Sequence, residues 1–508
     1  MRNISRITFL VFITVWLCGC TQPQVSDSLP RSVPEKEGMA SEGILQFVEA
    51  IEQSGQEWHS FVLLRHGKVV AEAWWNPYRP DLKQTIYSTS KTFTSTAIGF
   101  AVSEKLLTVD DKVISFFPDL LPDSISPNLA EMRVKHLLSM TTGQYPEPLN
   151  ITTGDQWVKN FLAAPIPNQP GTKFLYNSTA TYMLSAIIQK VSGQRLVDFL
   201  KPRLFEPLAI KDADWEICPQ GINTGGWGLR IHTEDMAKLG QLYLQKGKWN
   251  GKQLLPEAWI AEATTAKINQ KPDITPEQRE HDDRAQGYCY QIWRCQHNAF
   301  RGDGAFGQYI IVMPEQDAVL AVQANAYDMQ KEINFVWDYL LPAMHKDTLP
   351  ENKQQATALK QKLKTLAILP AKGIYQQETG FNLKTNYTLN DNAQQLKNMS
   401  IQMIGDTCSL IFNDLQFDFG EETWLAGETT KPCPNLIQSP SAYREFPPFK
   451  VFGSYHWQDD QTLTFILRYI ESPHFETMNC KFDGDKVQIT YKNSLNNQTT
   501  QIEGGRIK

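Results

Sequence analysis

The pattern of apolar residues changes near Gly373, and this change limits how the 508-residue chain can fold. Before it, segments with the 3.6-residue period of helices alternate with a few β-rich segments. After it, short alternating segments such as 451–457 and 463–469 are separated by Asn, Asp and Gly turns. The sequence therefore predicts an α+β domain followed by an all-β domain, either an antiparallel meander or a small barrel.

Within the first domain, β-rich segments stand at both ends. Segments 61–64 and 69–75 flank a His66-Gly67 turn, and 309–313 and 318–323 flank Pro314 to Asp317. Helical periodicity falls between or beside them, at 41–51, 88–105, 134–140, 180–191 and 233–245. We expect the first and last strands of this domain to share one sheet.

The charge balance and the distribution of apolar residues exclude two classes of protein. The chain has 49 Lys and Arg against 55 Asp and Glu, a net charge of −6, and no basic run that would bind nucleic acid. It also lacks a run of 18 apolar residues, which excludes a protein with several membrane spans. The 41% hydrophobic content is typical of a folded globular chain.

We expect the chain to begin with an export signal. Arg2 and Arg6 precede an apolar stretch at 7–17, which is followed by Cys18-Gly19-Cys20. This ending resembles the lipobox of bacterial lipoproteins, which implies cleavage before Cys20 and a lipid on its sulfur. With Thr21 after the cysteine, the resemblance implies an outer-membrane lipoprotein facing the periplasm. The alternative is an ordinary signal peptide with a coincidental cysteine.

Six of the eight cysteines remain after the signal. An exported chain can oxidise them, but six cysteines allow 15 pairings and the sequence does not choose among them. No Cys-x-x-Cys occurs, so no zinc or other metal site is expected.

Ser88-Thr89-Ser90-Lys91 is the only Ser-x-x-Lys in the chain. On a helix, residues three apart share one face, so the Lys91 amine can reach the Ser88 hydroxyl. A serine becomes a nucleophile when a neighbouring base takes its proton, and a buried lysine with a lowered pKa can be that base. Tyr87 and Phe93 flank the pair, which favours a buried helix over a solvated one.

Two further motifs follow in order. Tyr176-Asn177-Ser178 runs into the helix expected at 180–191, and Gly302-Asp303-Gly304 precedes the strand expected at 309–313. Together with 134–143 and 225–229, this series resembles the serine hydrolases of the class C β-lactamase, DD-peptidase and family VIII esterase group over about residues 37–345. The resemblance implies an antiparallel sheet flanked by helices with an all-helical subdomain.

The resemblance also implies roles for residues. Ser88 would be the nucleophile, Lys91 its activating partner, and Tyr176 a general base or proton relay. The backbone N–H groups of Ser88 and Ala305 would form the oxyanion hole. For Tyr176 to act as a base near pH 7, its pKa would have to fall by about three units from its usual value near 10, which we attribute to the Lys91 cation.

Two motifs depart from the family pattern. Asn177 and Ser178 stand exchanged relative to a Tyr-Ser-Asn order. In the third motif, Gly302-Asp303-Gly304 replaces the usual Lys-Thr-Gly or His-Thr-Gly, which removes a cation that would grip a substrate carboxylate, although Arg301 is adjacent. These departures favour the esterase and 6-aminohexanoate-dimer hydrolase branch over a true β-lactamase.

Other motifs are weaker. Residues 302–307 also satisfy G-x-G-x-x-G, but a β-rich segment follows where a dinucleotide site needs a helix. No G-x-S-x-G or H-E-x-x-H occurs. We therefore expect no cofactor and a small ester or amide as substrate. The alternatives are a DD-peptidase or β-lactamase, or a cell-envelope binding protein that has lost turnover.

The predicted organisation is a signal peptide, a tether, the hydrolase domain, a linker and a β-rich domain, at 1–19, 20–36, 37–345, 346–370 and 371–508. All chemical groups named above lie in 37–345. We therefore expect catalysis to need no side chain from the C-terminal domain.

Replacing Cys20 with Ala should move the protein from the membrane fraction to the soluble periplasmic fraction, because the lipid would lose its attachment atom. Fractionation followed by immunoblotting measures this. Equal membrane association of the wild type and Cys20→Ala would contradict the lipobox interpretation.

Overall fold

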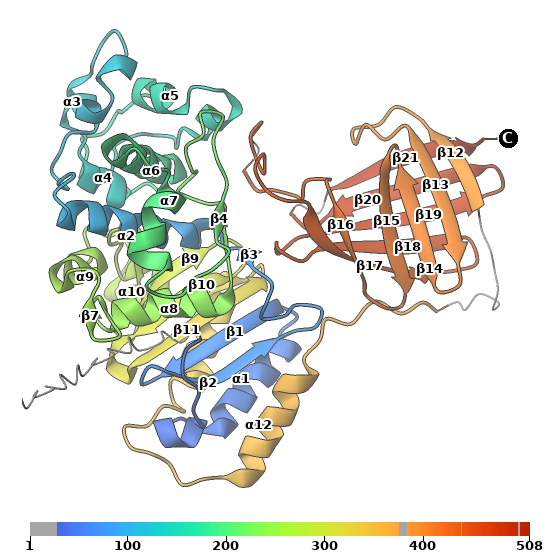
Figure 1. Cartoon of the computed structure of the whole chain (residues 1–508), viewed down its shortest axis with the longest axis horizontal. Helices are drawn as coiled ribbons and strands as arrows, with labels where there is room; N and C mark the ends of the chain where they lie inside the picture. Colours follow the sequence, from blue (N-terminus) through green and yellow to red (C-terminus); the bar gives the residue numbers. More distant parts are fainter. Residues whose placement is uncertain (1–27, 375–383, 438, 496–497, 508) are drawn as a thin grey trace, which may run out of the picture.

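The computed structural model describes residues 28–374, 384–437, 439–495 and 498–507. It has two parts, an α+β domain and a C-terminal barrel domain, which lie beside each other in Figure 1. The expected signal peptide at 1–19, Cys20 and residues 20–27 of the expected tether lie outside the described residues.

The α+β domain is built on a six-stranded antiparallel sheet with the order β2-β1-β11-β10-β9-β8. The strands are β1 (Glu57–Arg65), β2 (Lys68–Trp74), β8 (Trp293–Arg294), β9 (Phe300–Gly304), β10 (Gln308–Met313) and β11 (Ala318–Asn325). Because β1 pairs directly with β11, the expectation that first and last strands share one sheet is confirmed.

Alternate residues of β1 enter two separate cores. Phe61 and Leu63 pack with α1 (Ser41–Gln53) and α12 (Lys353–Thr365) on one face of the sheet. Val62 and Leu64 enter the larger core on the other face, where α8 (Thr233–Leu244) lies. Because both faces of the sheet are covered, β1 is buried at nearly every residue, which explains why it reads as a nearly continuous apolar run.

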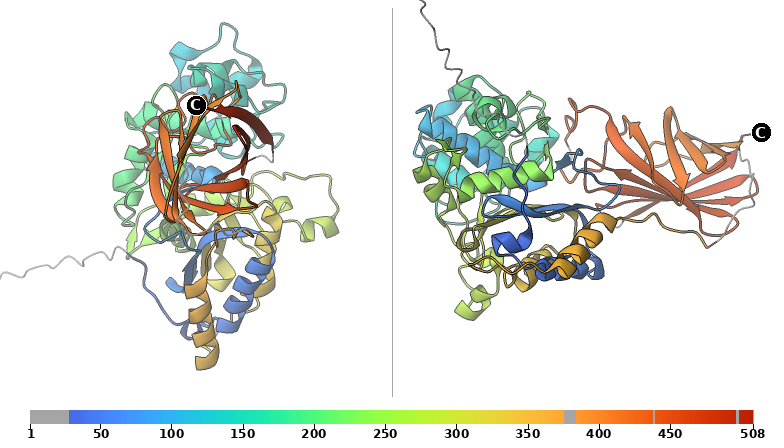
Figure 2. Two further views of the ribbon diagram at one scale, coloured as in Figure 1. Left: turned by 90° about the vertical axis from the view of Figure 1, so that its right-hand side faces the viewer. Right: turned by 60° about the horizontal axis from the view of Figure 1, so that its bottom comes forward.

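A helical region lies on the same side as α8 (Figures 1 and 2). Its centre is α2 (Ser90–Ser103), which is buried on nearly all sides, as its small Ser, Thr, Ala and Gly residues allow. The helices around it are α3 (Pro127–Glu131), α4 (Val134–Leu138), α5 (Trp157–Ala163), α6 (Ser178–Ser192), α7 (Leu196–Leu200) and α9 (Glu257–Thr264). This arrangement confirms the predicted fold class.

Shorter elements complete the domain. The short strands are β3 (Gln84–Thr85), β4 (Asp214–Trp215), β5 (Leu229–Ile231), β6 (Lys248–Trp249) and β7 (Lys252–Gln253). The short helical turns are η1 (Pro34–Glu37), η2 (Tyr87–Thr89), η3 (Val113–Phe116), η4 (Pro118–Leu120), η5 (Leu149–Thr153), η6 (Lys201–Phe205), η7 (Asp283–Ala285), η8 (Pro314–Gln316) and η9 (Val336–Leu340), with α10 (Pro276–Glu280) and α11 (Met329–Phe335).

Two connecting segments differ from the expected tether and linker. The described part of the tether, from residue 28, is packed on the domain, because Leu29 is buried and Arg31 pairs with Glu72 and Glu234. The expected linker at 346–370 contains a helix, α12. It also packs on the α+β domain, through buried Leu359.

The described residues of the C-terminal domain form ten strands in the order β15-β14-β13-β12-β21-β20-β19-β18-β17-β16. A parallel pairing of β15 with β17 closes nine of them into a barrel and leaves β16 at its edge. The strands are β12 (Lys384–Leu389), β13 (Asn398–Ile404), β14 (Thr407–Phe412), β15 (Leu415–Glu421), β16 (Leu425–Thr429), β17 (Phe449–Trp457), β18 (Thr462–Tyr469), β19 (Phe475–Asp483), β20 (Lys486–Asn493) and β21 (Thr499–Arg506). Of the two predicted arrangements, the barrel is the one formed.

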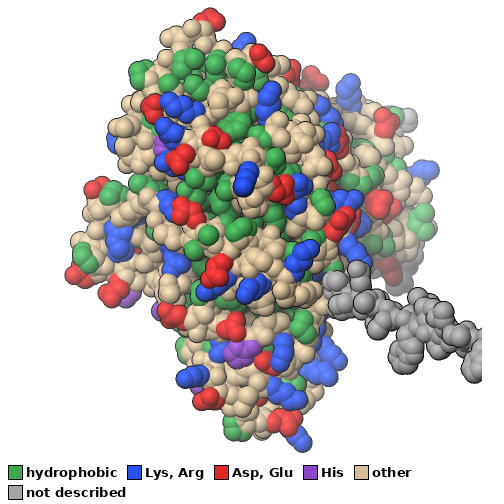
Figure 3. Space-filling model, turned by 60° about the vertical axis from the view of Figure 1, so that its left-hand side comes forward, with side chains coloured by type: hydrophobic (Ala, Val, Ile, Leu, Met, Phe, Trp, Pro, Cys, Tyr) green, Lys and Arg blue, Asp and Glu red, His purple; other side chains and the backbone are tan. Residues whose placement is uncertain are grey.

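Several general properties of the described residues are relevant to function. All six cysteines among them are free and buried. None of their helices combines the length and apolar character needed to cross a membrane. On the face shown in Figure 3, acidic and basic side chains are interspersed, without a large patch of one sign.

Candidate active site

The Ser-x-x-Lys pair lies where η2 runs into α2. Ser88 is half-buried in η2, and Lys91, in the first turn of α2, is only 2% exposed. The Lys91 Nζ lies 3.0 Å from the Ser88 Oγ, as the three-residue spacing predicts. The pair is therefore in position for direct proton transfer.

Three oxygen atoms surround the Lys91 amine. Besides Ser88 Oγ, Nζ donates to Ser178 Oγ at 3.2 Å and to the Gly226 carbonyl at 2.7 Å. A Cβ on Gly226 would lie 2.6 Å from the Ser178 carbonyl oxygen, so only glycine lets this backbone approach α6 and reach the lysine. The amine is thus held by hydrogen bonds that come from three separate segments.

Burial lowers the pKa of Lys91 to about 7, although the negative charges of Glu147 and Asp303 act in the opposite direction. A buried amine loses the hydration that stabilises its charged form, which explains the direction. Near neutral pH, a large fraction of Lys91 is therefore uncharged and can accept the Ser88 proton.

Tyr176 lies over the same amine. Its ring centroid is 4.9 Å from Lys91 Nζ, and its ring stacks on Trp293 at 5.9 Å. Burial raises the pKa of Tyr176 above its usual value. The expected lowering of this pKa by Lys91 is wrong, because burial disfavours the phenolate and Lys91 itself loses much of its charge.

The exchanged residues of the second motif have separate contacts. Asn177 caps α6, with its side-chain oxygen accepting from the Ala180 N–H at 2.9 Å, and its amide donates to Gln144 Oε1 at 2.8 Å. Ser178 instead contacts Lys91. A hydroxyl therefore contacts the lysine at the position where the family pattern has an amide.

The third motif forms the end of β9. A Cβ on Gly302 would lie 2.7 Å from Thr92 Oγ1, and one on Gly304 would lie 2.4 Å from the Ile86 carbonyl oxygen. These glycines therefore bring β9, and Ala305 after it, close to the segment that carries Ser88. Asp303 is bound by Arg301, whose Nε donates to its carboxylate at 2.8 Å.

Arg301 is not free to bind a substrate carboxylate. Its side chain is 0% exposed, and its guanidinium contacts Asp303, Cys295 at 2.9 Å and the Trp293 ring at 5.8 Å. Trp293 stacks in turn on Tyr176. Arg301 could therefore replace the cation that the third motif lacks only if this packed side chain moved.

Glu147 is a site residue that the sequence did not indicate. Its carboxylate accepts the Ser178 N–H at the start of α6, and burial raises its pKa. No sequence motif identifies Glu147, because a loop brings it to the N-terminus of α6. It also lines a cavity of about 610 Å³ with Tyr145, Leu149 and Ile151. A separate cavity of about 700 Å³ beside Arg195 and Trp215 includes none of the predicted site residues in its lining.

In the part of the chain that the structure describes, no three His, Cys, Asp or Glu side chains are grouped so that they could hold a metal ion. Proton transfer and nucleophilic attack are the chemistry that the Ser88, Lys91 and Tyr176 groups can perform.

The chain is similar in sequence or fold to several known proteins. Over 281 residues, the chain is 24% identical to the 6-aminohexanoate-dimer hydrolase of Paenarthrobacter ureafaciens, covering 51% of this chain and 71% of the relative. A structure of a Bacillus anthracis protein assigned as a 6-aminohexanoate-dimer hydrolase matches with a TM-score of 0.52 and 20% identity, over 64% of this chain and 89% of that one. A family VIII carboxylesterase matches with a TM-score of 0.48 and 16% identity, over 62% and 98%.

The fold and site together define a hydrolase-type domain with a Ser-x-x-Lys pair. The beta-lactamase family model matches residues 48–341, more than half of the chain. The chain therefore belongs to the beta-lactamase family, as its sequence motifs indicated.

The charge of Glu147 should set the pH at which Ser88 becomes reactive. In the wild type, the rate of fluorophosphonate labelling should rise through about pH 7 as Lys91 loses its proton. Glu147→Gln removes a negative charge that favours the ammonium, so the midpoint should move to lower pH. Glu257→Gln, which changes an exposed carboxylate on α9, is the control. An unchanged midpoint in Glu147→Gln would contradict the coupling.

Proposed function

We propose that the protein is a serine hydrolase that cleaves an ester or amide through a covalent acyl-enzyme on Ser88. The observation that carries the proposal is the 3.0 Å contact between Ser88 Oγ and an amine whose pKa burial lowers to about 7. The hydrolases among its relatives, including one named for an amide substrate, support the reaction class. The export signal leads us to propose a lipid anchor at Cys20 and a place in the bacterial cell envelope.

In the proposed first step, Ser88 Oγ attacks the substrate carbonyl carbon while its proton moves to Lys91 Nζ. The carbonyl oxygen becomes an oxyanion that accepts hydrogen bonds from the N–H groups of Ser88 and Ala305. As the bond to the leaving group breaks, the proton moves from Lys91 Nζ to that group through Tyr176, whose ring lies over the Lys91 amine. Water then attacks the carbonyl carbon of the acyl-enzyme while its proton moves to Lys91 Nζ. The bond to Ser88 Oγ breaks, the proton returns to Ser88, and the acid is released.

The charges around the site favour a neutral acyl group. Glu147 and Asp303 are the acidic groups that act on Lys91, Gly302 offers no cation, and Arg301 is buried against Asp303. A substrate carboxylate would therefore meet negative charge without a partner, which disfavours it. We propose a small neutral ester or amide as the substrate class.

Ser88→Ala should abolish both fluorophosphonate labelling and ester turnover, because the attacking oxygen is lost. Intact mass spectrometry measures the adduct, and a nitrophenyl ester measures turnover. Ser90→Ala, two residues further on, is the control and should still be labelled at Ser88. Undiminished labelling of Ser88→Ala would show that another residue is the nucleophile.

A neutral short-chain nitrophenyl ester should be hydrolysed at least about tenfold faster, in kcat/KM, than a chromogenic cephalosporin. A charge-assisted hydrogen bond to a carboxylate contributes about 1.5–3 kcal/mol, and this site lacks the cation for it. Lys91→Ala should lower ester turnover by about a hundredfold or more, as expected for a general base. Equal rates on both substrates, with cephalosporin turnover lost selectively in Arg301→Ala, would overturn the ester preference.

A further inference from the structure

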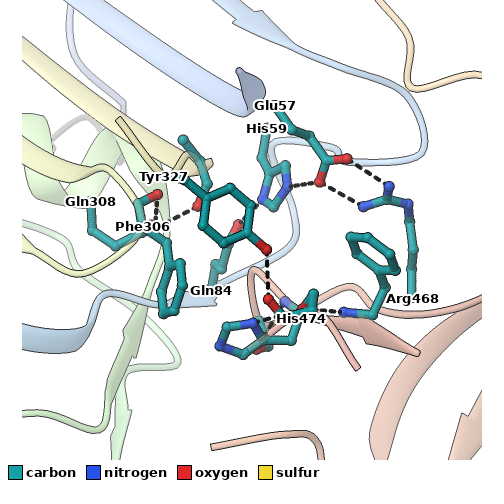
Figure 4. A network of polar contacts seen from close by, with 12 residues as sticks. Glu57, His59, Gln84, Phe306, Gln308, Tyr327, Arg468 and His474 are labelled. Atoms are coloured by element: carbon teal, nitrogen blue, oxygen red, sulfur yellow. Dashed lines mark hydrogen bonds and ion pairs between the residues drawn. The ribbon is translucent and has the colours of Figure 1, made fainter. Parts of the chain in front are cut away.

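The barrel domain is fixed to the α+β domain directly beside the candidate active site. Arg468 on β18 forms a bidentate ion pair with Glu57 on β1, at 2.7 and 2.8 Å (Figure 4). In the loop after β18, the Glu471 carbonyl accepts the Thr85 N–H at 3.0 Å, and its carboxylate binds buried Arg230 at 2.9 Å. The loop at 470–474 is therefore held against the chain just before Ser88.

His474 ends this loop and is fully buried. Its Nε2 hydrogen-bonds the Tyr87 hydroxyl, and its Nδ1 lies 3.0 Å from Ser494 Oγ. Its ring meets the Phe306 ring edge-on, with centroids 4.8 Å apart and planes at 90° (Figure 4). One imidazole from the barrel therefore contacts two residues of the other domain.

Those two residues adjoin the proposed oxyanion hole. Tyr87 immediately precedes Ser88, and Phe306 immediately follows Ala305. The side chains of Tyr87 and Phe306 also contact each other, with ring centroids 5.5 Å apart. The imidazole thus joins the two backbone segments whose N–H groups would bind the oxyanion.

Both segments have an unusual backbone. Tyr87 has a φ of 45° and Phe306 a φ of 64°, in the left-handed region that residues with large side chains rarely adopt. Such conformations persist only where the surroundings hold them. The contacts of His474 with both side chains supply part of that support.

His474 is suited to a fixed, uncharged role. Burial lowers its pKa to about 3, so the ring is neutral across the physiological range. A neutral imidazole has one N–H and one lone-pair nitrogen, and each nitrogen here faces a hydroxyl that can both donate and accept. The ring is therefore fixed in rotation by a partner at each nitrogen.

We propose that His474 of the barrel domain is a positioning residue for catalysis, which holds Tyr87 and Phe306 and through them the N–H groups of Ser88 and Ala305. This inference rests on the proposed acyl-enzyme function. It revises the expectation that catalysis needs no side chain from the C-terminal domain. His474 does not touch the reacting atoms, so its effect is exerted through the two backbone segments.

The test compares full-length variants on a neutral nitrophenyl ester. Tyr87→Phe removes only the hydroxyl that His474 binds, His474→Ala removes the ring, and His474→Gln keeps a group that can hydrogen-bond Tyr87. Arg195→Gln is the matched control, because it breaks an exposed ion pair with Glu445 across the same domain boundary. Thermal unfolding of each variant shows that it is folded at the assay temperature.

We expect kcat to fall about tenfold or more in Tyr87→Phe and His474→Ala, with KM within about twofold. Loss of a whole oxyanion donor costs about 10²–10³ in kcat, so its displacement should cost less. His474→Gln should recover part of the loss, and Arg195→Gln should stay within about twofold of the wild type. A purely structural role would lower the unfolding temperature without this selective loss of kcat.

The outcomes separate the two proposals. If the wild type is neither labelled by a fluorophosphonate nor active on esters, the proposed function fails. If the wild type is active and kcat is unchanged in Tyr87→Phe and His474→Ala, the positioning role is overturned. A rise in KM with unchanged kcat would overturn it as well. If His474→Ala does not fold, Tyr87→Phe alone tests the positioning role, because this variant keeps the aromatic ring at position 87 and its packing.

Discussion

The burial of a lysine amine is the constraint on which the candidate site depends. Lys91 can lie inside the domain only because Ser88, Ser178 and the Gly226 carbonyl replace the water that it would otherwise bind. Each acceptor comes from a different segment, so η2, the start of α6 and the loop before β5 must meet at one point. The same desolvation that makes this lysine costly to bury brings its pKa into the range of a general base.

The sequence predicted the parts of the molecule that depend on local pattern. The nearly continuous apolar runs of β1 and β11 and the three-residue spacing of Ser88 and Lys91 are visible in the residues themselves. Glu147 was missed because a loop carries it to the α6 terminus, and no local pattern encodes that approach. The pKa of Tyr176 was predicted in the wrong direction because burial, a tertiary property, outweighs one neighbouring amine.

The boundary between the domains is held by charged groups that are removed from water. Arg230 binds Asp214 within its own domain and Glu471 of the barrel, with both Arg230 and Glu471 nearly fully buried. Buried ion pairs often add little net stability, but breaking one leaves an unpaired charge at a cost of about 3–5 kcal/mol. Any other placement of the barrel would leave these buried charges unpaired and would therefore have a higher free energy. The sequence alone does not show that Arg230 and Glu471 pair, because a charged residue is ordinarily expected at the surface.

The pairing of β1 with β11 also has a consequence for the order in which the chain acquires structure. Phe61 lies opposite Val322, so the centre of the sheet joins segments made early and late in synthesis. Contacts between such distant segments form slowly, because a long loop must close before they can be made. The segment that carries Ser88 therefore emerges well before the strand that completes its surroundings, and the barrel strands emerge later still. A chain released early from synthesis would carry Ser88 without the later segments that surround it.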